Sequence, residues 1–446
     1  MFKLQYKPLS ICSGVFYFGP MIEHIFNHFL QVRKVTTDTR NIPSGAIFFA
    51  LKGERFNGNT FAAQALEAGA SMVVIDEEAY QIDHRTVLVE DVLSALQQVA
   101  KMYRDTFNIP FIGITGSNGK TTTKELMRDV LAVKYRVHAT KGNLNNHIGV
   151  PLTLLSMPMD TTLAIIEMGA NHQKEIEGYC IYAQPTHGLI TNIGKAHLEG
   201  FGGEEGVFKG KRELFIAVAN RGGLLFVNPE LPRLSEASEG RERVLYGYQS
   251  GDMQLEVVSE SPTLVYSSQW KGEHREVKTQ LAGAYNLYNI ASAIAVGRHF
   301  GVDENEIHKA IADYVPDNNR SQLHRASHND LILDAYNANP SSMEHAIQSF
   351  ANQQHPQKAF VLGDMRELGD ASEKEHERIF KLANALGLQG IWVGSWFQAI
   401  ANREGAIGFA DADAALTFLQ NEQWKDKLIL IKGSRGIRLE QLVPAL

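Results

Sequence analysis

Residues 113–125 read GITGSNGKTTTKE, and this stretch decides the fold. The stretch overlaps the end of PFIGI at 110–114, an apolar run that predicts a buried strand. After the glycines, apolar residues recur at helical spacing through Leu131, which predicts a helix. A glycine-rich turn between a strand and a helix directs backbone N–H groups at one point, where the helix dipole also favours negative charge. The stretch therefore predicts a phosphate-binding loop.

Two side chains in this loop suit a nucleotide. Lys120 supplies a cation for the β- and γ-phosphates, and Thr121 supplies a hydroxyl oxygen for Mg²⁺. The usual motif is G-x-x-x-x-G-K-[ST], but Ile114 occupies the position of its first glycine, so only the shortened form G-x-x-G-K-T is present. The alternative is a glycine turn that only caps the helix, and the strand-loop-helix context favours the phosphate site.

The composition is that of a multidomain globular protein. At about 150 residues per domain, the 446 residues predict three domains. A net charge of -7 without a long basic run argues against a nucleic-acid partner. Cys12 and Cys180 form no metal-ligand or redox spacing, which favours a cytoplasmic protein without a disulfide framework. No apolar stretch is long enough for a transmembrane helix.

Strand and helix patterns alternate along most of the chain, which predicts an α/β fold. After an extension at 1–20 that we expect to be disordered, the predicted domains are a small N-terminal α/β domain at 21–107, a central domain with a P-loop NTPase-like, mostly parallel sheet at 108–316, and a C-terminal Rossmann-like α/β domain at 317–446. Short alternating strands at 223–282 predict an antiparallel addition, and the turn-forming segment at 315–320 predicts a hinge.

Apolar runs place the individual strands. The expected strands lie at 46–51, 72–75, 87–89, 110–114, 163–166, 189–193, 331–333, 360–362, 391–393 and 428–431. Because ligands collect at the carboxyl ends of parallel strands, the residues that follow these strands are the ones to inspect for function.

Three side chains follow strands of the central domain. Glu167 comes directly after the strand at 163–166 and would place a carboxylate opposite Lys120, while His197 and Lys211 follow the strand at 189–193. Taken singly, each is more readily interpreted as an exposed glutamate, a loop histidine or a solvated lysine. Only their joint placement in one sheet favours a functional interpretation.

A series of segments resembles the Mur ligases of peptidoglycan synthesis, in this order and across nearly the whole chain from about residue 35. The segments are TGSNGKTTTKE (115–125), KGNLNNHIGVPLTLL (141–155), EMGANHQKEI (167–176), NIGKAHLEGFG (192–202), KGKRELF (209–215), AGAYNLYNIASAIAVG (282–297), LDAYNANPSSM (333–343), VLGDMRELG (361–369) and KGSRG (432–436). The pair YNANPSSM and LGDMRELG is typical of the family member that adds D-alanyl-D-alanine. Two positions depart from the family pattern, Leu333 in place of an acid and His147 in place of glutamate.

The resemblance implies an ATP site that holds two Mg²⁺ ions. The metal ligands that it implies are Thr121, Glu167, His197 and Lys211, the last carried as a carbamate whose hard oxygens suit Mg²⁺. Lys120, Glu167, His197 and Lys211 are the implied catalytic residues. The residues implied to hold ATP are Thr115, Gly116, Ser117, Asn118, Gly119, Lys120, Thr121, Thr122, Asn289 for adenine, Arg320 for phosphate and Asp334 for ribose. For the last three, a capping or surface role is an equal alternative on the residues alone.

The resemblance also implies contacts to the substrates. The uridine nucleotide and muramoyl-peptide would meet Thr37, Asp38, Thr39, Arg40, Lys52, Asn146, Asn171 and His172. The peptide end or the incoming dipeptide would meet Tyr336, Asn337, Asn339, Ser434 and Arg435. On motif strength alone, the sequence TDTR at 37–40 favours a turn with a helix-cap sequence instead.

The implied activity is an ATP-dependent ligase that joins D-alanyl-D-alanine to UDP-N-acetylmuramoyl-tripeptide through an acyl phosphate, in a monomer without membrane insertion. One alternative is a related ligase that adds a different amino acid or acts on folate. Another, from a different class, is a P-loop ATPase that regulates a partner. The third residue of the tripeptide, diaminopimelate or lysine, stays open.

Overall fold

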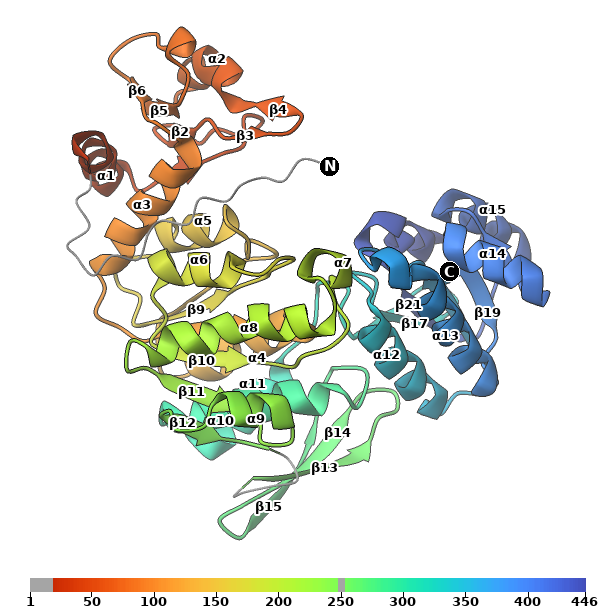
Figure 1. The fold of residues 1–446 in the computed structure, drawn as a ribbon. Coiled ribbons are helices and arrows are strands. Elements are labelled where there is room, and N and C mark those ends of the chain that lie inside the picture. Colours follow the sequence, from red (N-terminus) through yellow and green to blue (C-terminus); the bar gives the residue numbers. More distant parts are fainter. Residues whose placement is uncertain (1–18, 248–252) are drawn as a thin grey trace. The chain divides into compact units, whose positions relative to one another are not determined.

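The computed structural model describes residues 19–247 and 253–446, so most of the predicted extension at 1–20 lies outside the described residues (Figure 1). The chain divides into two compact units, and each is described by itself. The first unit contains the residues up to Gly113 together with Arg136–Gly169 and Lys174–Thr186. The second contains Ile114–Tyr135, Ala170–Gln173 and His187–Leu446.

The first unit begins with a four-stranded parallel sheet in the order β1-β2-β5-β6. Its strands are β1 (Val35–Thr36), β2 (Ile47–Phe49), β5 (Met72–Ile75) and β6 (Thr86–Leu88), and a short hairpin is formed by β3 (Lys52–Gly53) and β4 (Phe56–Asn57). The helices are α1 (Pro20–Val32), α2 (Ala62–Glu67) and α3 (Val92–Asp105), with 3-10 turns η1 (Gly58–Phe61) and η2 (Glu78–Tyr80). The strands expected at 46–51, 72–75 and 87–89 are confirmed.

The rest of the first unit surrounds a fully buried strand. This strand, β9 (Leu163–Glu167), pairs in parallel with β8 (Val137–Ala139), and the backbone N–H of Ala164 donates to the carbonyl of Pro110. Every residue of β9 is buried, as expected for a parallel strand covered on both faces. Helices α5 (Gly149–Leu155) and α6 (Glu175–Ala183) complete this part.

The phosphate loop lies where the two units meet along the chain. Strand β7 (Phe111–Thr115) has its first three residues in the first unit and its last two in the second, and α4 (Lys120–Ala132) follows the loop. In the second unit, β10 (His187–Ile190), β11 (Leu224–Val227) and β12 (Arg243–Leu245) pair in parallel. The remaining helices of this part are α7 (Leu198–Phe201), α8 (Glu204–Ala219), α9 (Pro232–Ala237), α10 (Asn286–His299) and α11 (Glu304–Asp313).

The expected antiparallel addition is shorter than predicted. Strands β13 (Gln254–Ser259), β14 (Val265–Trp270) and β15 (Glu273–Lys278) form a three-stranded antiparallel sheet. The prediction was wrong for its first part, because β11 and β12 continue the parallel sheet. The sequence LLFV of β11 is a continuous apolar run with its last three residues buried, which is the pattern of a parallel strand.

The C-terminal part of the second unit is built on a six-stranded sheet in the order β16-β17-β21-β18-β19-β20. Its strands are β16 (Gln322–Arg325), β17 (Asp330–Leu333), β18 (Lys358–Gly363), β19 (Gly390–Val393), β20 (Gly408–Phe409) and β21 (Leu428–Lys432). All neighbours pair in parallel except β16 and β17. The four strands expected here are confirmed, whereas β16 and β20 were not predicted. The helices and 3-10 turns are α12 (Pro340–Asn352), η3 (Gly369–Ala371), α13 (Ser372–Ala385), α14 (Ser395–Glu404), α15 (Ala412–Glu422), η4 (Arg435–Ile437) and η5 (Leu439–Ala445).

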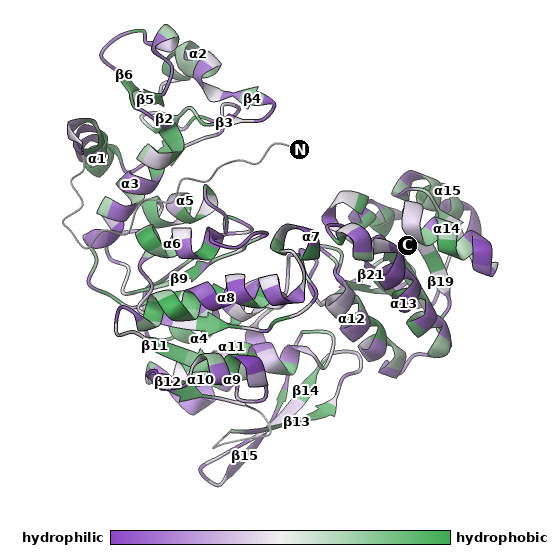
Figure 2. Cartoon of the chain, in the orientation of Figure 1, coloured by the Kyte–Doolittle hydropathy of each residue, from purple (hydrophilic) through white to green (hydrophobic). Residues whose placement is uncertain are grey.

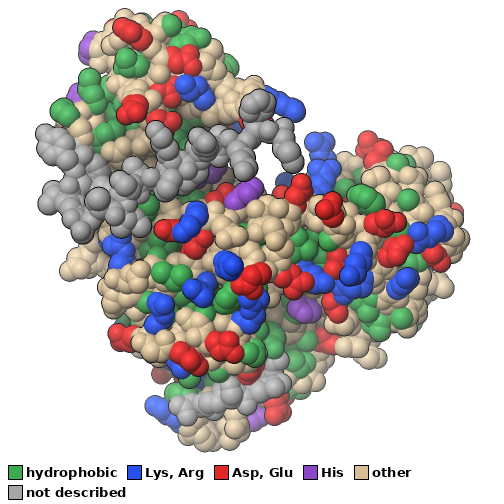
Figure 3. Space-filling view, viewed as in Figure 1, with side chains coloured by type: hydrophobic (Ala, Val, Ile, Leu, Met, Phe, Trp, Pro, Cys, Tyr) green, Lys and Arg blue, Asp and Glu red, His purple; other side chains and the backbone are tan. Residues whose placement is uncertain are grey.

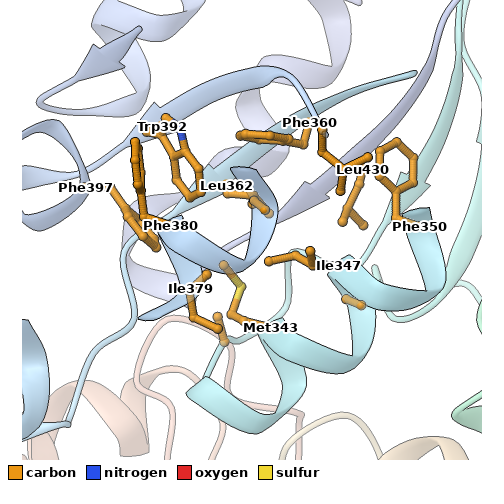
Figure 4. Close-up of a cluster of buried hydrophobic side chains, with 14 of the residues drawn as sticks. Met343, Ile347, Phe350, Phe360, Leu362, Ile379, Phe380, Trp392, Phe397 and Leu430 are labelled. Atoms are coloured by element: carbon orange, nitrogen blue, oxygen red, sulfur yellow. The ribbon is translucent and has the colours of Figure 1, made fainter. Parts of the chain in front are cut away.

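Alternate residues of this sheet point to two hydrophobic cores. Phe360 and Leu362 of β18 pack with α12, α13 and α14, whereas Val361 between them packs with α15 and η5. Figure 4 shows the first core, in which Trp392 lies among aromatic rings, with its centroid 4.7 Å from that of Phe397. In Figure 2 strands such as β2, β5 and β11 carry the colour of hydrophobic residues, β15 is mainly hydrophilic, and α8 alternates between the two along its length.

On the face shown in Figure 3, acidic and basic side chains are interspersed. In the described part of the chain, no helix combines the length and the apolar character that crossing a membrane requires.

Candidate nucleotide-binding site

The phosphate loop adopts a backbone that only glycine accommodates at two points. Gly116 has φ 147°, and a Cβ there would lie 1.9 Å from Thr191 Oγ1. Gly119 has φ 77°, and a Cβ there would lie 2.4 Å from Asn289 Oδ1. Both glycines therefore combine a left-handed backbone with a close approach of other side chains. This is a cradle that a side chain would fill, and the loop residues fit the phosphate groups implied by the sequence.

Residues that follow β10 hold this loop in place. The Asn118 backbone N–H donates to Asn192 Oδ1 at 3.0 Å, and its carbonyl accepts from Thr191 Oγ1 at 2.6 Å and Asn192 Nδ2 at 3.0 Å. The hydroxyl of Ser117 accepts from the Gly194 N–H at 2.9 Å and donates to the Gly194 carbonyl at 3.1 Å. The loop is thus preorganised by the side chains of Thr191 and Asn192 and by the backbone of Gly194.

The start of α4 has no side-chain cap at its N-cap position. Its N-cap is Gly119, which offers no side-chain acceptor to the N–H groups of the first turn. The ammonium of Lys120 lies over the loop and donates to the carbonyls of Gly116 at 2.6 Å and Ser117 at 3.3 Å. Helix dipole and ammonium therefore bring positive charge to one place. Thr115, Thr121 and Thr122 are all buried beside it.

Asn289 lies against the loop from α10. Its Oδ1 accepts from the hydroxyl of Thr123 at 3.0 Å, and its Nδ2 donates to Asn286 Oδ1 at 2.8 Å. The side chain is 7% exposed. Asn289 therefore joins α10 to α4 immediately beside Gly119, and the adenine contact implied for it stays a prediction.

His197 is oriented by an acid that the sequence reasoning did not single out. Its Nδ1 makes a short hydrogen bond with Glu367, and this hydrogen bond holds the pKa of the Glu367 carboxyl below its usual range. Because an ionised carboxylate only accepts, Nδ1 of His197 is the donor, which leaves Nε2 as the ring atom that could bind a metal. His197 itself has φ 52°, at the start of α7.

Lys211 is enclosed in the protein. It is 1% exposed, its Nζ donates to the carbonyl of Ala170 at 3.1 Å, and it lies 5.0 Å from the centroid of the Phe201 ring. The neighbouring Lys209 is exposed. Among residues 19–247 and 253–446, no three His, Cys, Asp or Glu side chains gather as a metal site. The implied metal ligands include a hydroxyl and a modified lysine, and they stay a prediction.

Glu167 lies in the first unit, as the last residue of β9. It is 1% exposed, its Oε1 accepts from Asn145 Nδ2 at 2.8 Å, and its backbone N–H donates to Thr140 Oγ1 at 2.9 Å. A buried carboxylate fixed by a neighbouring amide is well suited to hold a cation at a strand end. Asn146 lies just before α5, and its Oδ1 accepts from the backbone N–H groups of residues 148 and 149.

The C-terminal part brings two arginines to Tyr336. The guanidinium carbon of Arg320 lies 3.8 Å from the ring centroid, and that of Arg435 lies 5.9 Å from it. Nε of Arg320 is buried and has no hydrogen-bond partner among the described residues. The two cations are weakly hydrated planar groups that suit phosphate. Their convergence on one ring agrees with a phosphate contact for Arg320 and leaves that contact a prediction.

Asp334 forms a buried ion pair with Lys432. The two side chains are separated by 2.6 Å between Oδ2 and Nζ, and their exposed fractions are 15% and 2%. Lys432 also donates to the carbonyl of Asn337 at 3.3 Å, and Asp334 Oδ1 accepts from the Ser321 N–H at 3.3 Å. The ion pair fixes the loop after β17, where the implied ribose contact would lie.

Most of the remaining residues that are implied to contact substrate form hydrogen bonds or ion pairs with other residues of the chain. Asp38 and Arg40 form a bidentate ion pair in an exposed turn. The hydrogen bonds from the Arg40 side chain lower the pKa of Asp38 to about 2. Lys52 pairs with Asp76 at 3.0 Å, and Glu77 lies 3.2 Å from it. Thr37 and Thr39 belong to the turn that contains Asp38 and Arg40. Asn171 and His172 lie beside Gly200 of α7. The hydroxyl of Ser434 accepts a hydrogen bond from the Arg366 N–H.

Three functional candidates emerge only from the structure. They are Asn192, which holds the phosphate loop, Glu367, which orients His197, and Lys432, which pairs with Asp334. Each lies inside a motif that was recognised as a whole, NIGKAHLEGFG, VLGDMRELG and KGSRG. The sequence motifs could have pointed to these three residues, but the residues that they contact lie far away in the sequence.

Three family models match the chain. They are described as the Mur ligase family catalytic domain at residues 31–104, the Mur ligase middle domain at 114–297 and the Mur ligase glutamate ligase domain at 319–435. A Bacillus subtilis protein named UDP-N-acetylmuramoyl-tripeptide--D-alanyl-D-alanine ligase is 36% identical over 92% of each chain. An Escherichia coli protein of the same name is 33% identical over 92% of this chain and 93% of its own length.

Solved structures agree with these relatives. MurF from Acinetobacter baumannii is 32% identical with a TM-score of 0.82 over 92% of each chain. MurF from Thermotoga maritima in complex with ADP is 26% identical with a TM-score of 0.82, covering 93% of this chain and 97% of that chain. The chain therefore has the three-domain α/β architecture of these structures, with several mostly parallel sheets.

Proposed function

The chain belongs to the Mur ligase family, and from this we propose that it is an ATP-dependent ligase that joins D-alanyl-D-alanine to UDP-N-acetylmuramoyl-tripeptide. The observation that carries the proposal is the 36% identity, over 92% of both chains, to a relative named for this reaction. The preorganised phosphate loop supports the use of ATP, since its shape and charge suit the phosphates of a nucleotide.

We assign the nucleotide to residues of the loop and to three residues outside it. The loop from Thr115 to Thr122 would bind the phosphates, Asn289 the adenine, Arg320 a phosphate and Asp334 the ribose. The arrangement supports these roles, because Asn289 lies beside Gly119 and Lys432 fixes Asp334.

For Mg²⁺ we propose four holding residues: Thr121, Glu167, His197 and, as a carbamate, Lys211. When bound, Mg²⁺ ions neutralise charge on the phosphoryl oxygens and so favour nucleophilic attack. The burial of Glu167 and the orientation of His197 by Glu367 support their part in this set. The carbamate would replace the repulsion between an ammonium and a cation by an attraction.

In the proposed reaction, the terminal carboxylate of the tripeptide attacks the γ-phosphorus of ATP, the bond to the β-phosphate oxygen breaks, and ADP leaves. Lys120 and the loop N–H groups would stabilise the transferring phosphoryl group. The amine of D-alanyl-D-alanine then attacks the acyl phosphate, loses a proton, and phosphate leaves as the amide forms. Closure of the C-terminal domain at the hinge 315–320 would exclude water from the acyl phosphate.

The proposal includes the substrate contacts and the setting. We place the uridine nucleotide and muramoyl-peptide at residues 37–40, Lys52, Asn146, Asn171 and His172, and the peptide end at Tyr336, Asn337, Ser434 and Arg435. The domains would be 21–107, 108–316 and 317–446, after the extension at 1–20. We expect a cytoplasmic monomer that acts in peptidoglycan precursor synthesis.

The test is ADP formation by the purified protein with each substrate in turn. We expect turnover only when both UDP-muramoyl-tripeptide and D-alanyl-D-alanine are present, and loss of turnover in Lys120→Ala. Turnover without an amine would instead favour a regulatory ATPase. Turnover with another amine, or with a folate substrate, would favour a different ligase.

A further inference from the structure

The first turn of α12 contacts the phosphate loop directly. Asn339, for which the resemblance implies a substrate contact, donates from Nδ2 to Asn118 Oδ1 at 2.7 Å. Its own Oδ1 accepts from the Ser342 N–H at 2.9 Å, and the Ser342 hydroxyl accepts from the Asn339 N–H at 3.1 Å. Both ends of the Asn339 amide are therefore engaged by the protein, one in a capping box and one on the phosphate loop.

A second path joins the same two segments. The Lys195 N–H donates to Ser341 Oγ at 3.1 Å, and Lys195 directly follows Gly194, which exchanges hydrogen bonds with Ser117. A Cβ at Gly194 would lie 3.0 Å from Ser341 Oγ, so the Ser341 side chain packs closely on the backbone of Gly194. Adjacent loop residues, Ser117 and Asn118, are thus both connected to the first turn of α12.

The contact is supported by packing that does not involve Asn339. Lys195 Nζ lies 2.7 Å from Glu375 Oε1, and the Glu375 side chain is 5% exposed. Glu375 in turn pairs with Arg378 at 2.8 Å. A substitution of Asn339 therefore removes the hydrogen bond to Asn118 and leaves these ion pairs in place.

We propose that Asn339 is a positioning residue that holds the phosphate loop in its nucleotide-binding geometry through Asn118. The backbone of Asn118 is fixed by Thr191 and Asn192, and the hydrogen bond from Asn339 fixes its side chain. Preorganisation of a loop lowers the ordering cost of binding. Because coupling is reciprocal, bound nucleotide also favours the contact of α12 with the loop. The inference rests on the proposed use of ATP.

The test uses Asn339→Ser in the full chain. Serine is a good N-cap but is too short to reach Asn118, so the variant keeps the cap and loses the loop contact. We expect ADP with Mg²⁺, measured by calorimetry, to bind about fivefold more weakly, the effect of one hydrogen bond. Without nucleotide, the amides of residues 115–119 should exchange faster, while the melting temperature stays near that of the wild type.

Ser342→Ala is the matched control, since it disrupts the capping box and keeps the hydrogen bond to Asn118. It should lower the melting temperature and leave ADP affinity unchanged. Asn118→Ala should weaken ADP binding as Asn339→Ser does, and the double variant should bind no more weakly than either. Wild-type affinity in Asn339→Ser, or additive losses in the double variant, would overturn the inference. A wild-type protein that does not bind ADP would overturn the proposed function as well.

Discussion

Two helices of the second unit start after a strand and a loop, and their first turns differ. The N-cap of α4 is Gly119, without a side chain, whereas the N-cap of α12 is Asn339, which forms a capping box with Ser342. A third helix, α14, is closed by Asp364, whose carboxylate accepts from the N–H groups of Trp396 and Phe397. Topology alone places all three at strand ends. The N-cap residue alone does not decide whether a first turn is capped, because α14 also has a glycine, Gly394, at its N-cap and is capped by the remote Asp364.

The largest expected effect comes from distorting the loop that precedes α4. In Gly116→Ala the new Cβ would lie 1.9 Å from Thr191 Oγ1, so the loop must move. We expect kcat/KM for ATP to fall by at least about 1000-fold, equivalent to about 4 kcal/mol. Gly222→Ala is the control, because Gly222 has φ 68° with open space around it and should cost stability alone, about 1 kcal/mol. Equal activity of both variants would contradict the importance of this loop geometry.

Next in size is the ion pair at the end of β17. Lys432→Met leaves the carboxylate of Asp334, 15% exposed, without its cation, and we expect about 3 kcal/mol of lost unfolding free energy. Urea unfolding followed by tryptophan fluorescence would measure it. Adding Asp334→Asn should recover part of the loss, since it removes the uncompensated charge. The exposed Lys425 provides the control, and Lys425→Met should have little effect.

A smaller effect is expected at the closed start of α14. Asp364 is 5% exposed and accepts from Trp396 N at 3.0 Å and Phe397 N at 2.9 Å. Asp364→Ala should therefore cost about 2 kcal/mol of unfolding free energy. Asp364→Asn, which keeps one acceptor oxygen, should lose less. Neither variant should change ADP affinity, and a change would show that the two helix starts are not independent.

The smallest effect is the pH dependence contributed by His376, beside Asp364. His376 is fully buried, accepts from the Met365 N–H and donates to the Ser372 carbonyl, and burial lowers its pKa. Below pH 6.5 the unfolded state takes up a proton that the folded state does not, so stability falls as pH falls, by up to about 1.4 kcal/mol per pH unit. Stability should be restored above pH 6.5.

Urea midpoints at pH 7.5, 6.5 and 5.5 would measure this dependence. The curve for His376→Asn should be flatter than that of the wild type, because asparagine does not titrate. Other histidines with a lowered pKa, among them the half-buried His187 with a pKa of about 4, steepen both curves alike. Parallel curves for the two proteins would mean that folding does not change the pKa of His376.

Much of the fold could be predicted, because its signals are local. The strand at 72–75 is four consecutive apolar residues and was predicted at its observed bounds. Strand β20 has two residues, too few to leave a pattern, and it was missed. Strand β11 was placed in an antiparallel addition, because pairing direction depends on which strand lies beside it. Burial of the first four residues of β9 agrees with their unbroken apolar sequence, whereas the burial of its last residue, Glu167, does not follow from that pattern.

The candidate site also has a part that could be predicted from the sequence and a part that could not. By itself the sequence determined the phosphate loop, because glycine at two turning points and a helix that follows are properties of consecutive residues. Only the tertiary structure decided what holds that loop, since Asn339 lies 221 residues from Asn118 and Glu367 lies 170 residues from His197. Such pairs form when packed sheets and helices bring remote segments together. Local propensity carries no information about them.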